Sequence, residues 1–264
     1  MKKTTVSLKV TKQAPHVTSD HILSVYNLVK EFHEIFGHPI ESGEITAEML
    51  RLRANLIREE AKKEGLGAVN DANKVEILDA AGDTIYVLAG TLVMMGNSLS
   101  HALAFNKFES GISLKVSLRI GSDPLSDLKT AFEFCEGVVY DLDHIASLIE
   151  QNKGAKASDL LQVLPYAIAD VIHLLNHIVA MCGVSMPDVV AAIHESNMSK
   201  LWSADIEERQ RQVENCKYNP ADLAFRPCLT RDGMIGYRIS DDKILKSPSY
   251  TPVDLSSFAD EWDV

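Results

Sequence analysis

Apolar residues recur every three or four positions along most of this chain, which is the spacing of an amphipathic α-helix. The stretch from Asp20 to Phe36 shows this pattern, with Asp20 as the helix cap and Gly37 and Pro39 as the residues that end the helix. The sequence therefore predicts an all-α protein. The same spacing predicts further helices over residues 45–64, 74–95, 98–108, 125–151 and 158–182, and one that begins after Ser185.

Two parts of the chain lack this spacing. Residues 109–124 contain glycines and a proline, and within them the VSLRI segment at 116–120 is a candidate short strand. From Trp202 onward the chain is polar, contains prolines and shows little periodicity, with a hairpin expected around Asp232 and Gly233. These last residues are expected to form an irregular C-terminal tail.

An internal repeat lies at an offset of 87 residues. Residues 77–105 align without gaps with residues 164–192, and eight of these 29 positions are identical, among them Asp83 with Asp170. The two copies predict tandem helical repeats that pack as a pseudo-dimeric helix bundle. A single irregular helical domain, in which helix-turn-helix patterns recur by chance, is the alternative. The repeat divides the chain into an N-terminal arm (1–19), a first repeat (20–110), a degenerate second repeat (123–202) and a C-terminal extension (203–264).

Composition indicates a compact globular protein. The 264 residues are 46% hydrophobic, and a net charge of −11 with no basic cluster argues against a nucleic-acid partner or an anionic membrane surface. The apolar run at 163–184 is interrupted by Pro165, Asp170 and His173, so it is not expected to span a membrane. Four cysteines without metal-binding spacing, and no signal peptide, predict reduced thiols in a cytoplasmic protein.

Two clusters of carboxylates lie on consecutive predicted helices. Asp83, in the second cluster, leads directly into the apolar stretch 84–95, and a buried carboxylate is unfavourable unless it is paired or binds a metal ion. Two helices that present oxygen ligands to each other favour a Mg²⁺ site. A solvated helix face is the alternative for the first cluster, which also contains Lys62 and Lys63. The candidate metal ligands are Glu59, Glu60, Glu64, Glu76, Asp79 and Asp83.

The spacing of these acids resembles that of the all-α nucleoside triphosphate pyrophosphohydrolases. Glu59–Glu60 followed by Glu76-x-x-Asp79 and Asp83 is similar to the EE…ExxD motif of this superfamily, which includes MazG, dimeric dUTPases, dCTP pyrophosphatases and phosphoribosyl-ATP pyrophosphohydrolase. Three further segments resemble its MazG-like branch in phages and bacteria. They are VKEFHEIFGHP, DAAGDTIYVLAGT, and IHESNMSKLW followed by RISDDKILKSPSYTPVDL.

The resemblance implies hydrolysis of a (deoxy)nucleoside triphosphate between its α- and β-phosphates, with Mg²⁺, or Mn²⁺ in its place, as the cofactor. It also implies that Glu59, Glu60 and Asp83 are catalytic and that Asn197 and Lys200 of the SNMSK segment contact phosphate oxygens. The chain departs from the family pattern twice. The third acid of the usual EExxE falls on Lys63, with Glu64 one residue late, and the position three residues before Asp83 is Ala80, with Asp79 displaced by one.

Base selection requires stacking and edge hydrogen bonds, which His33 and Phe36 could provide, although core packing explains Phe36 at least as well. Family members commonly act as dimers. Because only the first repeat keeps the acids, the resemblance implies a fused pseudo-dimer with one catalytic centre, and two such chains could pair further. A catalytically inactive nucleotide-binding or regulatory module, or a helical interaction protein, stays open as an alternative.

One further pattern resembles a transition-metal site. Asp170, His173 and His177 lie one helical turn apart along residues 158–182. Tyr86 and Gly90 occupy the positions of the two histidines in the first repeat. We therefore favour a core or interface role for these histidines.

Overall fold

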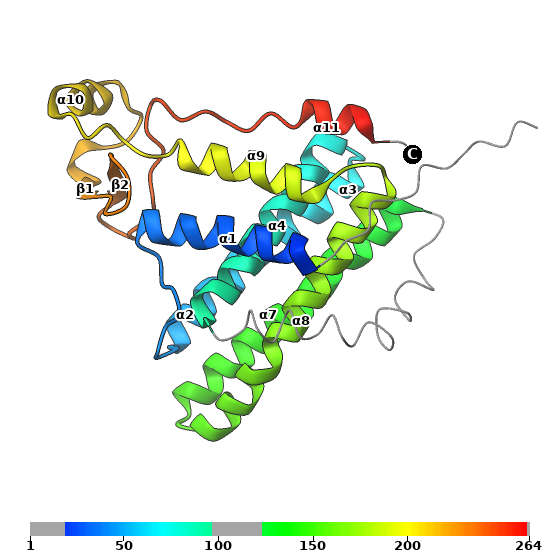
Figure 1. Cartoon of the computed structure of the whole chain (residues 1–264). Coiled ribbons are helices and arrows are strands. Elements are labelled where there is room, and N and C mark those ends of the chain that lie inside the picture. Colours follow the sequence, from blue (N-terminus) through cyan, green and yellow to red (C-terminus); the bar gives the residue numbers. More distant parts are fainter. Residues whose placement is uncertain (1–18, 97–122, 263–264) are drawn as a thin grey trace, which may run out of the picture.

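The computed structural model describes residues 19–96 and 123–262, and these residues are mostly helical (Figure 1). The all-α prediction is confirmed. The predicted helix over 98–108 and the candidate strand at 116–120 lie outside the described residues. The helices are α1 (Ser19–Phe36), α2 (Ala47–Ile57), the π-helix η1 (Arg58–Gly65), α3 (Leu66–Asn70), α4 (Lys74–Met95), α7 (Pro124–Glu150), α8 (Gly154–Met181), α9 (Met186–Met198), α10 (Ile206–Asn215), the 3₁₀ turn η3 (Pro220–Asp222) and α11 (Ser256–Glu261).

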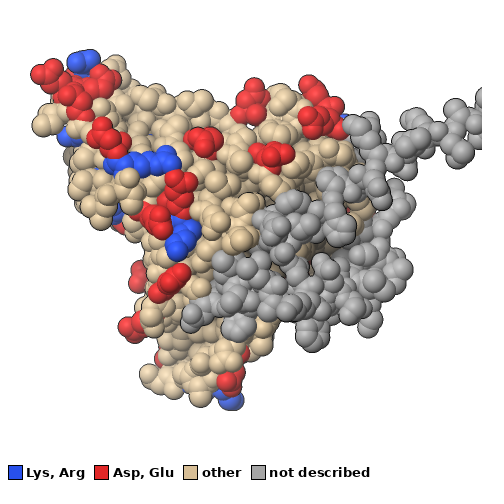
Figure 2. Space-filling view, in the orientation of Figure 1, with Lys and Arg blue, Asp and Glu red and all other residues tan. Residues whose placement is uncertain are grey.

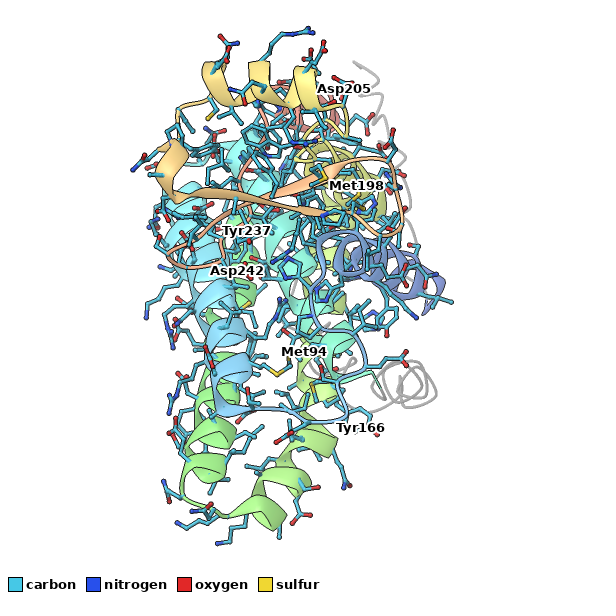
Figure 3. The ribbon with its side chains drawn as sticks, turned by 90° about the vertical axis from the view of Figure 1, so that its left-hand side faces the viewer. Met94, Tyr166, Met198, Asp205, Tyr237 and Asp242 are labelled. Atoms are coloured by element: carbon cyan, nitrogen blue, oxygen red, sulfur yellow. The ribbon has the colours of Figure 1, made fainter. Side chains whose placement is uncertain are left out.

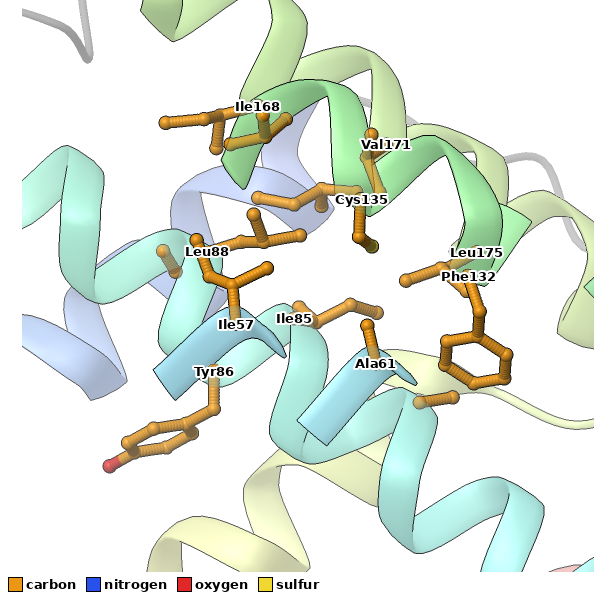
Figure 4. Packing of buried hydrophobic residues seen from close by; sticks show 14 of the residues in the cluster. Ile57, Ala61, Ile85, Tyr86, Leu88, Phe132, Cys135, Ile168, Val171 and Leu175 are labelled. Atoms are coloured by element: carbon orange, nitrogen blue, oxygen red, sulfur yellow. The ribbon is translucent and has the colours of Figure 1, made fainter. Parts of the chain in front are cut away.

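Four long segments form a helix bundle at the centre of the fold. The continuous helix α2–η1 packs on α4 and α7, and α8 packs on both α7 and α4. Figure 4 shows their apolar side chains meeting inside the bundle, with Ile57 of α2, Ile85 of α4, Cys135 of α7 and Leu175 of α8 all turned inward. Each of these four side chains is at most 1% exposed. The bundle therefore rests on the apolar stripes that the sequence pattern predicts.

The ends of α4 and α7 follow from local signals in the sequence. The side chain of Asn73 caps α4 by accepting a hydrogen bond from the backbone N–H of Glu76, and Gly96 ends it at a positive φ of 68°. Asp123 caps α7 in the same way, and Pro124 occupies its first turn. The predicted limits 74–95 therefore agree with the observed helix.

A second layer covers one side of the bundle. Helices α1 and α9 both pack on α4 and on each other. The strands β1 (Leu223–Pro227) and β2 (Met234–Arg238) form an antiparallel hairpin, which confirms the hairpin expected around Asp232 and Gly233. Figure 3 shows this hairpin, labelled at Tyr237, lying close to Met198 at the end of α9.

The C-terminal extension is more regular than predicted. Helix α10 lies within it, although its only strongly apolar residue in the first turn, Ile206, is 74% exposed. Trp202 anchors the extension, since its ring is 1% exposed and its Nε1 donates a hydrogen bond to the Leu245 carbonyl at 2.9 Å. After the hairpin the chain runs back beside α9 to α11, which packs on α4 (Figure 1).

Each predicted repeat contains one helical hairpin of the bundle, α2–η1 with α4 in the first and α7 with α8 in the second. These two hairpins lie side by side. The division of the chain into two repeats nevertheless stays a prediction. Helices α4 and α8 are long and apolar enough to cross a membrane, yet 83% and 67% of their most apolar windows are buried within the fold. They are therefore accounted for as core helices.

Candidate metal and phosphate site

Carboxylates from η1 and α4 lie close enough to raise one another's pKa values. Burial raises the pKa of Glu60 to about 8, and repulsion from Asp83 and Glu64 adds to it. Burial likewise raises the pKa of Asp83 to about 7, with a further contribution from Asp79. Asp79 also has a raised pKa, first through burial and then through Glu76 and Glu64. The structure therefore brings Glu60, Glu64, Asp79 and Asp83 into one acidic cluster, which we call the acid cluster.

The π-helical turn of η1 explains how Glu64 joins this cluster. A π-helix closes i→i+5 hydrogen bonds and holds about one residue more per turn than an α-helix. The one-residue displacement of Glu64 from the family spacing is therefore absorbed by the wider turn. The contribution of the Glu64 charge to the raised pKa values of Glu60, Asp79 and Asp83, after that of burial, agrees with this placement. Asp79 is also displaced by one residue, but its position one turn before Asp83 leaves both on the same side of α4.

A hollow of about 400 Å³ lies at one edge of the acid cluster. The hollow is lined by Glu64 of η1, by Glu76 and Asp79 of α4, and by Asp71 from the turn between α3 and α4. Glu76 itself is exposed, and it affects the pKa of Asp79. Glu76 therefore lies at the rim of the acid cluster, as does the equally exposed Glu64.

Glu59 lies at the outer side of the acid cluster, although its charge adds to the effect of burial in raising the pKa of Glu60. Its side chain is 54% exposed, and it pairs with Lys63 at 3.7 Å on the same turn of η1. Both residues line a separate surface hollow with Arg58 and Lys62. The catalytic role implied for Glu59 by the resemblance stays a prediction, and this geometry favours Glu60 for that role.

Helix α9 brings Asn197 and Lys200 to the acid cluster. The close packing of α9 on α4 depends on Gly82, because a Cβ at this position would lie 2.3 Å from the Ile193 side chain. Lys200 donates a hydrogen bond from Nζ to Asn197 Oδ1 at 2.5 Å. Burial lowers the pKa of Lys200 to about 8, while the nearby charge of Asp83 acts in the opposite direction. Lys200 therefore lies near Asp83, and Asn197 is hydrogen-bonded to Lys200.

The C-terminal extension adds a cation that the sequence analysis did not assign. Lys246 acts on the pKa values of Asp79, Asp83 and Lys200, so its charge lies near all three. Its Nζ stands 4.1 Å from the centre of the Tyr250 ring. Lys246 belongs to the DDKILKSPSY phrase that contributes to the family resemblance, but only the folded chain shows which acids it faces.

A polar chain fixes α1, α4, α9 and the hairpin loop relative to one another. The Tyr86 hydroxyl and His194 Nδ1 are hydrogen-bonded at 2.9 Å, and His194 Nε2 lies 3.2 Å from a carboxylate oxygen of Glu31. Arg231 pairs with the other oxygen of Glu31. Tyr86 points away from the bundle core in Figure 4, consistent with these contacts. These polar contacts thus hold α9, and with it Asn197, against α4.

His33 and Phe36 of α1 occupy different environments. His33 is buried, and its ring Nδ1 lies 2.7 Å from the Pro39 carbonyl. Phe36 is fully buried in a small apolar cluster with Ile235 of the hairpin. Phe36 therefore has a packing role, while a substrate contact for His33 stays a prediction.

Among residues 19–96 and 123–262, no three His, Cys, Asp or Glu side chains converge in a geometry that would already hold a metal ion. This applies to the acid cluster and equally to Asp170, His173 and His177 of α8.

Charge of both signs alternates at the α10 and hairpin end of the face in Figure 2, without a continuous basic area on that face.

Residues 29–104 match the family model of phosphoribosyl-ATP pyrophosphohydrolase. This family is a member of the MazG-like nucleotide pyrophosphohydrolase superfamily, so the resemblance inferred from the sequence is confirmed. The matched segment contains the whole acid cluster, but it ends before α7, α8, α9 and the C-terminal extension. The match indicates nucleotide pyrophosphohydrolase activity in general terms.

A viral protein resembles the chain over nearly its whole length. It is an uncharacterized protein of Acanthamoeba polyphaga mimivirus, 28% identical over 251 residues, which cover 89% of this chain and 94% of the relative. The likeness therefore extends over the C-terminal extension as well as the matched family segment. No solved structure matches the chain significantly.

Proposed function

We propose that this protein is a Mg²⁺-dependent pyrophosphohydrolase that cleaves (deoxy)nucleoside triphosphates between the α- and β-phosphates. The observation that carries the proposal is the position of Lys200 beside the acid cluster, which combines metal-binding oxygens with a cation for phosphate. The family match supports the reaction class. Mn²⁺ is expected to replace Mg²⁺, because both ions take oxygen ligands.

The chemistry of the acid cluster fits a divalent cation. Glu60 and Asp83 are held among other carboxylates, and their raised pKa values reflect burial first and repulsion from the neighbouring acids second. Hard oxygen donors on facing helices are the ligands that Mg²⁺ prefers. Glu60, Glu64, Asp79 and Asp83 would hold the ion after side-chain rearrangement, with Glu76 at the rim. When bound, Mg²⁺ would neutralise phosphate oxygens and assist the attacking water.

The residues of the chain have separate tasks in the proposed reaction. The water oxygen forms a bond to the α-phosphorus, and the bond from that phosphorus to the bridging oxygen breaks, so that pyrophosphate leaves. As one of the carboxylates that would hold the ion, Glu60 would accept a hydrogen bond from the attacking water with its second oxygen and so orient it, while the proton of the water passes to solvent. Lys200 and Lys246 lie where they would stabilise the charge of the departing pyrophosphate.

Pyrophosphate release from a panel of ribo- and deoxynucleoside triphosphates, with and without Mg²⁺, tests the proposal. Glu60→Ala and Asp83→Ala should each abolish Mg²⁺-dependent release while circular dichroism shows unchanged helicity. Lys129→Ala, on α7, is the control for an unrelated surface change. Nucleotide-dependent thermal stabilisation without turnover in the wild type would refute hydrolysis and leave a nucleotide-binding module.

A further inference from the structure

Arg53 is a cation without a carboxylate partner in the described part of the chain. Its Nε donates to Thr91 Oγ1 at 3.0 Å, and its Nη2 donates to the Val87 carbonyl. Both acceptors are neutral groups on α4. The neighbouring Arg51 differs, because it reaches the carboxylate of Glu150 at 2.7 Å. A guanidinium has five N–H donors, so Arg53 keeps donors beyond these two contacts.

Gly90 makes room for this guanidinium on α4. A Cβ at position 90 would lie 2.5 Å from Arg53 Nη2 and 3.0 Å from His33 Nε2. Both atoms therefore lie directly over the same helical turn. Any larger residue at position 90 would displace one of them. The glycine thus brings a donor group and an imidazole nitrogen together at one point.

His33 presents an acceptor at that point. Its Nδ1 must donate to the Pro39 carbonyl at 2.7 Å, because a carbonyl oxygen only accepts. Burial, aided by the charge of Arg53, lowers the pKa of His33 to about 3. The ring is therefore neutral near pH 7, and Nε2 carries a free lone pair. A donor from Arg53 and an acceptor from His33 stand side by side.

Aromatic rings border the same place. His38 stacks on Phe32 with ring centres 5.3 Å apart, and His33 lies 5.4 Å from His38. Phe32 and His38 are only partly buried, so their rings remain within reach of a ligand. Burial lowers the pKa of His38, and the three charges that lower it further are the cations Arg53, Arg226 and Lys200. The surroundings suit a flat, electron-rich group.

The distance from the acid cluster suits the length of a nucleotide. Gly90 follows Asp83 by seven residues, which is roughly 10 Å along an α-helix. Lys200 links the two places, because it lies near Asp83 and its Nζ is 5.7 Å from the centre of the Phe32 ring. A triphosphate held at the acid cluster would place its base toward Arg53 and Phe32.

We propose that Arg53, together with His33 and Phe32, recognises the ring carbonyl of a nucleobase and makes the site selective for keto bases. The guanidinium would donate to the carbonyl oxygen, and His33 Nε2 would accept the adjacent ring N–H, as in hypoxanthine, guanine, uracil and thymine. The amino group of adenine or cytosine would instead direct its own donor at a cation. This inference rests on the proposed function for the placement of the phosphates.

Two substrate pairs that differ in one exocyclic group test the inference. In each of dITP against dATP and dUTP against dCTP, a carbonyl is replaced by an amino group at constant ring size. We expect the wild type to show kcat/KM higher for the keto member by on the order of tenfold or more in at least one pair. Arg53→Met should bring that ratio close to one by lowering the keto value alone.

A second variant and a control separate recognition from folding. Gly90→Ala keeps the charge but displaces the guanidinium, so it should reduce the same ratio. Arg51→Met, on the same helix, should leave the ratio unchanged. Equal kcat/KM within both pairs, or an equal loss for keto and amino substrates in Arg53→Met, would overturn the inference. Circular dichroism of each variant checks the fold.

Binding measurements distinguish this inference from the proposed function. Triphosphates with a non-hydrolysable α,β-methylene bridge can be titrated into the full chain by calorimetry. If the wild type hydrolyses none of the four substrates but binds keto analogues more tightly, and Arg53→Met loses that preference, hydrolysis is refuted and base recognition is supported. If the wild type hydrolyses all four substrates without any base preference, hydrolysis is supported and base recognition is refuted.

Discussion

Glu60→Gln should stabilise the metal-free protein relative to the wild type, and the difference should grow as the pH rises. Burial and the neighbouring acids raise the pKa of Glu60 from 4.5 to about 8. Between these two values the folded state holds a proton that the unfolded state has released, so the stability of the wild type falls as the pH increases. The neutral amide of the variant has no proton to lose and avoids this loss.

The size of the effect follows from the window between the two pKa values. One proton changes the free energy of unfolding by about 1.4 kcal/mol per pH unit. Between about pH 6 and about pH 8 the wild type can therefore lose at most roughly 2.7 kcal/mol of unfolding free energy through Glu60. Solvent still reaches part of the side chain, and halving the limit for screening leaves roughly 1–1.5 kcal/mol. His33 and His38, with pKa values lowered to about 3 and about 4, contribute an opposite slope below pH 6.5. That slope is common to both proteins and cancels in the difference.

Urea unfolding followed by circular dichroism, in the presence of a chelator at about pH 6, 7 and 8, measures this difference. Glu48→Gln is the matched control, since Glu48 is an exposed carboxylate in the first turn of α2, on the same continuous helix. It is not among the acids whose charges raise the pKa of Glu60. The control should show no added pH dependence. Mg²⁺ should stabilise the wild type more than Glu60→Gln, because binding to the folded state adds RT ln(1 + [L]/Kd). Parallel stability profiles for wild type and Glu60→Gln would refute the picture of a repulsive acid cluster.

Three further changes test other parts of the structure. Lys200→Ala should raise KM or lower kcat by a factor that corresponds to roughly 1.5–3 kcal/mol, the range for a hydrogen bond to a charged group, and unchanged kinetics would place Lys200 outside the phosphate site. Asp170→Asn should leave pyrophosphate release unchanged and keep or slightly raise stability at about pH 8 by urea unfolding, because burial alone raises the pKa of this carboxyl; loss of turnover would indicate a second working site. Trp202→Ala should destabilise the C-terminal extension by roughly 3–5 kcal/mol, seen as faster limited proteolysis near the hairpin, whereas unchanged cleavage would show that the extension does not depend on this ring.

Elements with complete local signals could be predicted from the sequence. Helix α4 begins and ends where its cap Asn73 and the positive-φ Gly96 indicate, and its apolar residues form the bundle core. The two acid-bearing segments and the SNMSK segment were also predicted to meet, and the structure places Lys200 beside Asp83. These features depend on residues close together in sequence, or on a family pattern that already relates distant ones.

Features that depend on a small change of helical geometry or on distant contacts could not be predicted. The segment 45–64 shows ordinary helical periodicity, yet it continues as a π-helix from Arg58. The displaced Glu64 was the available signal for this change, but a displaced acid is equally compatible with a lost ligand. Arg53 and Lys246 gain their significance from neighbours on other elements, which no local spacing reveals.

The second helical hairpin explains how the acid cluster is supported without supplying acids to it. The π-helix carries Glu60, and its outer side chains are fastened to α7: Arg58 pairs with Asp143 at 2.9 Å, and Lys62 pairs with Glu136 at 3.1 Å. Ala61, which lies between these two cations, is 1% exposed in the bundle core. Such partly exposed ion pairs contribute little stability individually, but two of them on one wide turn limit its rotation. Helix α7 therefore orients the turn that directs Glu60 toward Asp83.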